Sequence, residues 1–179
     1  TLEDHGILRG KHMNIYDIMK QRRSIRSYKP DPVEEEKLTR ILEAARSAPS
    51  AANRQPIYFV IIKDEKTKQQ LKKAYDEKWF YTAPVIICVC GVTEKAWKRG
   101  DGKNYADIDA AIAMDHLILA ATEEGLATCW IAAFKVHIVK SILKLPPGIE
   151  PVAMTPLGYP LDIPESTYRK PLEEMVKII

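Results

Sequence analysis

Three arginines stand close together near the start of the chain, in the stretch QRRSIRSYKP at residues 21–30. Arg22, Arg23 and Arg26, with Ser24 between them, could surround a phosphate with charge-assisted and partly bidentate hydrogen bonds. The same cations at the end of a short helix could instead complement the helix dipole and remain in solvent. The stretch alone therefore leaves open both an anion site and a solvated helix end.

A second group of polar side chains lies in the loop PSAANRQP, residues 49–56, which leads directly into an apolar run. Ser50, Asn53 and Gln55 offer a hydroxyl and two amides, and each amide both donates and accepts hydrogen bonds. Such groups suit the edge of a heterocycle that presents C=O and N–H groups. The alternative is that Ser and Asn satisfy nearby backbone groups, as they do in ordinary loops.

Two further segments could complete a ligand site. In WIAAF, residues 130–134, small side chains would let a flat ligand approach the backbone at the end of a buried strand. In YRKP, residues 168–171, a basic pair could supply another side of a phosphate site. A packed strand end and an exposed tail are the respective alternatives.

Hydrophobic patterning indicates one layered domain of helices and strands. Apolar periodicity and caps predict helices at 14–22, 31–48, 64–77, 105–124 and 136–148, with Asn14 and Asp31 capping the first two. Strands are predicted at 57–63, 84–92, 126–134 and 150–160, the first two covered on both faces because their apolar runs do not alternate. Neither GxGxxG nor GxxxxGK[ST] occurs, so a bound phosphate would have to be held by side chains.

Taken together and in this order, these motifs resemble the nitroreductase family. The segments that carry the resemblance are RRSIRSY, PSAANRQP, GLATCWIAAF, LGYP and RKPLEEMV. The resemblance covers residues 13–179 as a single domain, and residues 1–12 are set apart as an N-terminal extension. It implies an α+β fold with a mixed central β-sheet flanked by helices. It also implies an intertwined homodimer with flavin mononucleotide (FMN) at the interface.

The resemblance assigns cofactor contacts position by position. The residues matched to flavin-binding positions are Arg22, Arg23, Ser24, Arg26, Ser50, Ala51, Asn53, Gln55, Ile131, Ala132, Ala133, Arg169 and Lys170. Those of the 50–55 loop would reach the flavin of the partner subunit. Ala132 stands where the family usually has glycine, beside flavin N5. Between Arg169 and Lys170, the sequence does not choose the phosphate contact.

The implied function is that of an FMN-dependent oxidoreductase with no catalytic side chain, since flavin N5 is the reactive centre. NADH or NADPH would give a hydride to the flavin, leave, and be replaced by a nitroaromatic or quinone-like acceptor in a ping-pong cycle. One alternative is other flavin chemistry on the same fold, namely dehalogenation, flavin fragmentation or dehydrogenation. Relatives with such chemistry often carry an added lid, for which this chain offers only residues 92–104. A non-enzymatic polyanion-binding module is the other alternative.

Composition argues against several other classes of protein. The net charge of +3 is too small and dispersed to indicate a nucleic-acid partner. Three cysteines without a CxxC pair, and four scattered histidines, indicate neither a disulfide framework nor a metal site, and Cys88 and Cys90 are predicted to share one buried face of a strand. Without a signal-peptide pattern or a long apolar run, we expect a cytoplasmic protein with no membrane partner.

Overall fold

Four strands form the central sheet, and every ladder between them is antiparallel. The structure, a computed structural model, describes residues 14–179, so the extension expected at residues 1–12 lies outside the described residues. The strand order is β1-β2-β4-β3, with β1 at Ile57–Ile62, β2 at Val85–Val92, β3 at Ala127–Thr128 and β4 at Ile149–Gly158. An isolated parallel bridge joins Ser24 to Thr128, which ties the arginine stretch to the β3 side of the sheet.

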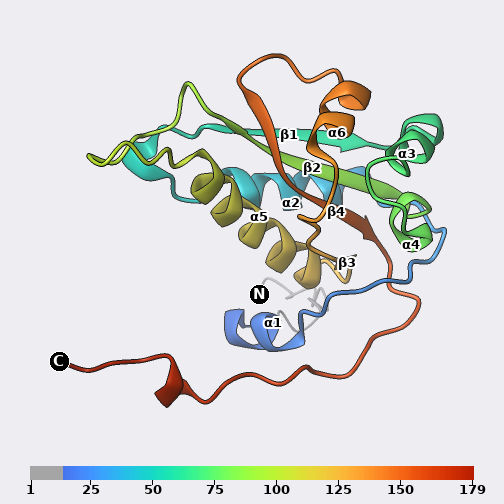
Figure 1. The fold of residues 1–179 in the computed structure, drawn as a ribbon. Coiled ribbons are helices and arrows are strands. Elements are labelled where there is room, and N and C mark those ends of the chain that lie inside the picture. Colours follow the sequence, from blue (N-terminus) through green and yellow to red (C-terminus); the bar gives the residue numbers. More distant parts are fainter. Residues whose placement is uncertain (1–13) are drawn as a thin grey trace, which may run out of the picture.

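Helices cover both faces of this sheet (Figure 1). They are α1 (Ile15–Gln21), α2 (Glu35–Arg46), α3 (Glu65–Leu71), α4 (Lys78–Tyr81), α5 (Ala106–Glu123) and α6 (Val136–Leu143), with 3₁₀ turns at Ala51–Asn53 and Leu172–Glu174. Ile87 and Val89 of β2 pack with α2 and α5, whereas Cys88 and Cys90 pack with α3, α4 and α6. The predicted α+β fold is confirmed.

The strand β2 is buried on both faces, as its continuous apolar run predicts. The prediction that Cys88 and Cys90 share one side is also confirmed, because their Sγ atoms lie 3.6 Å apart in the core. β1 is also covered on both faces, because Phe59 and Ile61 pack against one core cluster and Ile62 lies in the other, but this strand is at the edge of the sheet and Tyr58 is 47% exposed. A continuous apolar run does not reveal whether a strand lies at the centre or at the edge.

Two predicted element bounds also need correction. The second helix begins at Glu35 rather than near Asp31, and Glu34 occupies the N-cap position without a side-chain cap bond. The acidic residues at its start interact favourably with the helix dipole in place of a hydroxyl or carboxylate cap. The third strand has two residues, after which Ile131 forms only an isolated bridge to Met154. By contrast, Asn14 caps α1 as predicted, accepting from the N–H groups of Tyr16 and Asp17.

The long helix α5 is largely buried within the chain, which accounts for its alanine-rich and almost wholly apolar composition. Its first turn lies so close to β2 that a Cβ at Gly91 would stand 3.0 Å from the Cβ of Ala106. The C-terminal segment contrasts with this packing, since every residue from 161 to 179 is exposed. In Figure 1 this segment runs extended past α1 and away from the sheet. Across residues 14–179, no helix has the length and apolarity needed to span a bilayer.

Candidate functional site

The arginine stretch and the C-terminal segment meet in a hollow of about 500 Å³, here called the basic hollow. It is lined by the end of α1, residues 22–26 and part of residues 164–169. The charged side chains in its lining are Lys20, Arg22, Arg23, Arg26, Arg169 and Glu165. With five cations against one carboxylate, the lining has a net positive charge that suits an anion. Segments about 140 residues apart in the sequence thus converge as the sequence predicts.

The four arginines are not equivalent. Arg23 donates from Nη1 to the backbone oxygens of Lys20 and Arg22, the latter at 2.9 Å, so it satisfies carbonyls at the end of α1. Arg169 donates to Thr167 Oγ1 at 2.6 Å. Among the described residues, neither Arg22 nor Arg26 donates a side-chain hydrogen bond to protein. Their guanidinium groups therefore have the most hydrogen-bonding capacity left for a ligand.

Aromatic side chains lie beside the arginine stretch. The guanidinium carbon of Arg26 lies 5.9 Å from the centre of the Trp79 ring, within cation–π range. Tyr75 meets Trp79 edge to face, with ring centres 5.9 Å apart. These two aromatic residues cannot be identified from the sequence, because Tyr75 lies between α3 and α4, Trp79 lies in α4, and neither belongs to a recognisable motif. Their placement next to Arg26 comes from the tertiary fold.

A buried cysteine and a half-buried tyrosine lie close to the same arginines. Burial raises the pKa of the Cys129 thiol, an effect that the nearby charge of Arg26 and a hydrogen bond with Ser24 partly offset. Burial likewise raises the pKa of Tyr28, whose hydroxyl donates to Ile25 O at 2.6 Å. Both groups are therefore neutral at physiological pH, so neither carries a negative charge that would offset the positive charge of the arginines.

The strand end at residues 131–133 is only partly open. Ile131 is buried and pairs with Met154, whereas Ala132 and Ala133 are exposed. The backbone N–H of Lys135 donates to Ala74 O at 3.1 Å, which holds this strand end beside the segment that carries Tyr75 and Trp79. Ala132 and Ala133 are small and exposed, so the approach of a flat ligand to this strand end stays a prediction that the exposure allows.

The loop at residues 50–55, here called the amide loop, has an uncommon backbone. Ala52, Asn53 and Gln55 have φ values of 53°, 51° and 51°, in the left-handed region that favours glycine. Such a conformation costs roughly 1–3 kcal/mol for a non-glycine residue and is concentrated at functional sites. Bonds within the loop stabilise it: Gln55 N–H donates to Ser50 Oγ at 2.9 Å, and Gln55 Nε2 donates to Asn53 Oδ1 at 3.1 Å.

The amide loop does not lie at the basic hollow of its own chain. It precedes Ile57, which pairs with Gly91 near the end of β2, whereas Val85 at the start of β2 pairs with Leu157 on the side of β3. The six residue steps from Val85 to Gly91 span about 20 Å. Arg22, Arg23, Ser24, Arg26 and Arg169 are therefore brought together, while Ser50, Ala51, Asn53 and Gln55 are not brought to them. Lys170 is exposed and is not part of the hollow's lining.

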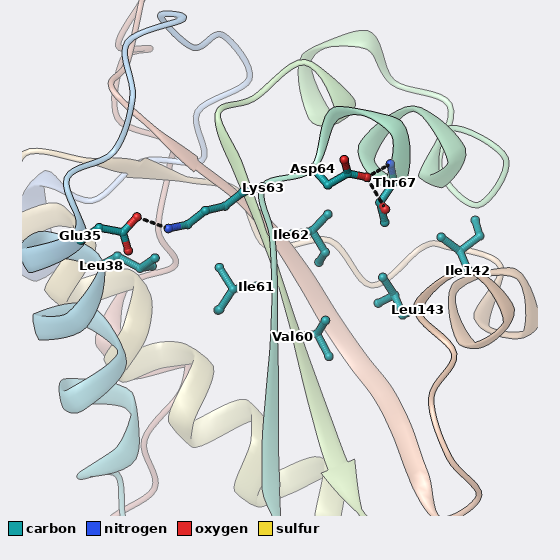
Figure 2. A pocket seen from close by; sticks show the side chains of 10 residues that line it. All are labelled: Glu35, Leu38, Val60, Ile61, Ile62, Lys63, Asp64, Thr67, Ile142 and Leu143. Atoms are coloured by element: carbon teal, nitrogen blue, oxygen red, sulfur yellow. Dashed lines mark hydrogen bonds and ion pairs between the residues drawn. The ribbon is translucent and has the colours of Figure 1, made fainter.

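A separate groove of about 620 Å³, here called the edge groove, runs along the outer side of β1. Figure 2 shows Val60 to Ile62 of β1, with Lys63 just after them, between Leu38 of α2 and Ile142 and Leu143 of α6. Lys63 forms an ion pair with Glu35, and Asp64 accepts from Thr67 N–H at 2.8 Å, so the charged groups at this end are paired. Within residues 14–179, no strand pairs with the outer edge of β1.

The part of the chain that the structure describes contains no set of side chains that could bind a metal ion. No group of three or more His, Cys, Asp or Glu side chains in residues 14–179 is placed to hold an ion. The fold and the basic hollow instead define a class: an α+β domain that offers an anionic ligand several arginines, with small residues and aromatics alongside.

Comparison with known proteins identifies that class. The model of the nitroreductase family matches residues 19–80 and 69–159. The crystal structure of a nitroreductase family protein from Clostridium difficile 630 is 40% identical, with a TM-score of 0.86, and the match covers 92% of this chain and 98% of that one. The chain belongs to the nitroreductase family and is an oxidoreductase, which confirms the resemblance seen in the sequence.

Relatives within the family have different activities by name. A Bacillus subtilis protein named FMN reductase [NAD(P)H] is 30% identical, over 84% of this chain and 68% of its own length. A Nematostella vectensis protein named iodotyrosine deiodinase is 27% identical, over 94% of this chain and 76% of its own length. Membership of the family therefore leaves the choice of acceptor open.

Proposed function

We propose that this chain is an FMN-dependent NAD(P)H oxidoreductase that reduces nitroaromatic or quinone-like acceptors. The observation that carries the proposal is the basic hollow, where Arg22, Arg26 and Arg169 converge from two ends of the sequence. FMN ends in a phosphate with about 1.5–2 negative charges at neutral pH, which suits several guanidinium groups. The relative named FMN reductase [NAD(P)H] supports the choice of flavin.

The donors present fit such a phosphate. Arg22 and Arg26 have no competing protein acceptor among the described residues, and Ser24 adds a hydroxyl between them. Arg169 lies in the lining while Lys170 does not, which favours Arg169 as the C-terminal phosphate contact. Arg23 would contribute charge from its position at the end of α1. Glu165 would have to be neutralised by one of the arginines, so we assign it no contact with the ligand.

When bound, the flavin would supply hydride chemistry at N5, and the chain would supply position and charge. A cation–π contact with Trp79 would help to orient the guanidinium of Arg26 toward the ligand. The exposed residues Ala132 and Ala133 would give the flat ring an edge to approach. We assign no side chain the role of nucleophile, and the protons of the acceptor's reduction would come from water.

The amide loop would act on the flavin of a second copy. The amide loop lies roughly 20 Å along the sheet from the basic hollow of its own chain, so the two do not converge within one chain. If Ser50, Ala51, Asn53 and Gln55 contact the cofactor held by Arg22 and Arg26, they must come from a partner. This reasoning supports a homodimer with FMN at the interface.

The C-terminal segment supports the same assembly. Its exposed apolar side chains include Leu161, Ile163, Leu172, Met175, Val176, Ile178 and Ile179. Apolar residues in that number rarely remain in solvent on a monomer. The edge groove offers an apolar lining and a strand edge with free backbone groups, which an extended segment can extend by one more strand. We therefore propose that the part of the partner's C-terminal segment that follows Arg169 occupies the edge groove, while residues 164–169 remain at the basic hollow of their own chain.

The proposal is tested with the purified chain. A yellow sample absorbing near about 450 nm would reveal bound flavin, because the cofactor supplies that band. Bleaching by NADH and by NADPH, followed by reoxidation with nitroaromatics and quinones, would identify the donor and the acceptor class. A colourless protein that takes up no added FMN would overturn the proposal and favour a polyanion-binding module.

A second candidate function is reductive dehalogenation, which the relative named iodotyrosine deiodinase favours. The test includes iodotyrosine among the acceptors and measures iodide release. Turnover of iodotyrosine at rates above those for nitroaromatics would establish this alternative. We place either activity in the cytoplasm, with a small-molecule acceptor and neither a nucleic-acid nor a membrane partner.

A further inference from the structure

We infer that Asp109 is a positioning residue, which holds the amide loop in the shape and place needed to contact flavin. The inference rests on the proposed function, because it concerns how the loop presents itself to the cofactor of the partner subunit. Asp109 lies in the first turn of α5 and is 1% exposed. Asp109 is the buried acid of this helix, whereas Asp107 and Asp115 are exposed.

The geometry connects this carboxylate to the loop and to nothing else described. Asp109 Oδ1 accepts from the backbone N–H of Ala51 at 2.9 Å, across 58 positions of sequence. Its other oxygen, Oδ2, is buried without a hydrogen-bond partner among the described residues. A buried carboxylate with one unsatisfied oxygen is unfavourable for folding, and an apolar side chain of similar volume would avoid that penalty. The stability of the core therefore does not explain why an acid stands here.

The loop itself explains what the bond does. Ala52, Asn53 and Gln55 hold left-handed backbone angles, and the bonds from Gln55 to Ser50 and Asn53 stay within the loop. Those bonds fix the loop's internal shape but not its position on the domain. Besides the bond from Ile57 N–H to Gln55 O next to it in the chain, two hydrogen bonds among the described residues attach the loop to the domain. They are the charge-assisted bond to Asp109 and a longer one, at 3.3 Å, from Arg54 to Ala96 O. The bond to Asp109 begins immediately before the strained residues.

The test measures FMN affinity of the full-length apoprotein by quenching of flavin fluorescence. Asp109→Ala removes the acceptor, and we expect the FMN dissociation constant to rise about tenfold. Asp109→Asn keeps an acceptor oxygen without the charge, and we expect a rise of only about two- to threefold. Asp107→Ala is the matched control: it removes an exposed acid from the same helical turn, and the affinity should stay within twofold of wild type.

A second substitution tests whether the carboxylate of Asp109 stabilises the strained backbone of the amide loop. Glycine adopts left-handed angles without penalty, so Ala52→Gly should recover about half of the logarithmic loss when added to Asp109→Ala. A general weakening of the core would not be relieved by a glycine in the loop. Should Asp109→Ala fail to fold, Ala51→Pro removes the same bond from the donor side. The extended backbone of Ser50 and the first-turn position of residue 51 both accept proline.

The outcomes separate this inference from the proposed function. If the wild-type chain binds no FMN, the proposed function is wrong and the inference falls with it. If wild type binds FMN and Asp109→Ala or Ala51→Pro binds it equally well, only the inference is wrong. Equal losses in Asp109→Ala and Asp109→Asn would also overturn it, as would a double variant with Ala52→Gly that recovers nothing. A graded loss with recovery by glycine supports it.

Discussion

In the proposed function, the basic hollow and the amide loop would recognise the ligand in opposite ways. The hollow presents long, charged side chains, of which Arg22 and Arg26 are not hydrogen-bonded to other described residues. The amide loop presents short, uncharged groups on a backbone fixed by internal bonds and by Asp109. Charge attracts a phosphate over a range of geometries, whereas an amide must be placed within a few tenths of an ångström. One region can therefore remain flexible, and the other must be rigid.

The largest effect is expected from breaking the hollow. Arg22→Ala removes a charge-assisted phosphate contact, worth about 1.5–3 kcal/mol, which corresponds to a rise of roughly 10- to 100-fold in the FMN dissociation constant. Riboflavin lacks the phosphate, so its affinity should change little. Arg46→Ala is a matched control, because Arg46 pairs with Glu43 on the exposed side of α2. Full flavin content in Arg22→Ala would remove this arginine from the phosphate site.

A smaller and differently distributed effect is expected from the amide loop. Asn53→Ala should weaken FMN and riboflavin equally, by about five- to tenfold, because the loop would contact the ring that both ligands share. Asn53→Gly also removes the amide but keeps the left-handed backbone angle at no strain. The difference between the two variants separates the contribution of the side chain from that of the backbone. Selective loss of FMN over riboflavin in either variant would place the loop at the phosphate instead.

Salt should weaken the binding of FMN more than the binding of riboflavin. Raising the ionic strength from about 0.05 to 0.5 M shortens the screening length to a few ångströms and weakens attraction between exposed arginines and a phosphate. We expect the affinity for FMN to fall about three- to tenfold, while the affinity for riboflavin is nearly constant. Isothermal titration with both ligands measures this directly. A parallel decline for both would mean that charge is not what the hollow contributes.

The smallest effect is expected from an ion pair that belongs to neither region. Arg40 binds Glu124 through two bonds of 2.6 and 2.8 Å, and this hydrogen bonding lowers the pKa of Glu124 below its ordinary value. A lowered carboxyl pKa gives stability that is present above the unfolded value and lost as pH falls through the folded one. Because Arg40 is 57% exposed, solvent screens the pair and it contributes little to stability.

Glu124→Gln should therefore lower the melting temperature slightly at pH 7 and leave FMN affinity unchanged. The same substitution should reduce the loss of stability between about pH 5 and pH 3, where carboxylates protonate. Thermal unfolding at a series of pH values measures both effects. A change in flavin binding would mean that the ion pair between Arg40 and Glu124 is coupled to the flavin site.

Much of the hollow could be predicted from sequence because charge and chain order identify it. The sequence shows basic residues at 22, 23 and 26 and again at 169 and 170. The resemblance to the family predicts that these two groups converge. Which of them is engaged cannot be predicted, because the bonds from Arg23 to helix carbonyls depend on where α1 ends. Trp79 was missed for a similar reason, since its contact with Arg26 exists only in the folded chain.

The fold was predictable where periodicity and capping agree, and less so where context decides. Asn14 caps α1 because its side chain has local donors to bind, whereas Asp31 lies too far ahead of α2. The edge position of β1 depends on which strands pair, and the apolar run at 57–63 does not indicate its pairing partners. The left-handed angles of Ala52 and Gln55 were equally hidden, because neither residue type favours them.

The burial of all three cysteines gives the protein a built-in reporter of opening. Thiol reagents react only with groups they can reach, so the labelling rate of the native enzyme measures how often each site unfolds. Cys88 and Cys90 lie at the centre of the sheet and should label only through global unfolding. Cys129 lies close to the arginines, and a bound cofactor should slow its labelling first.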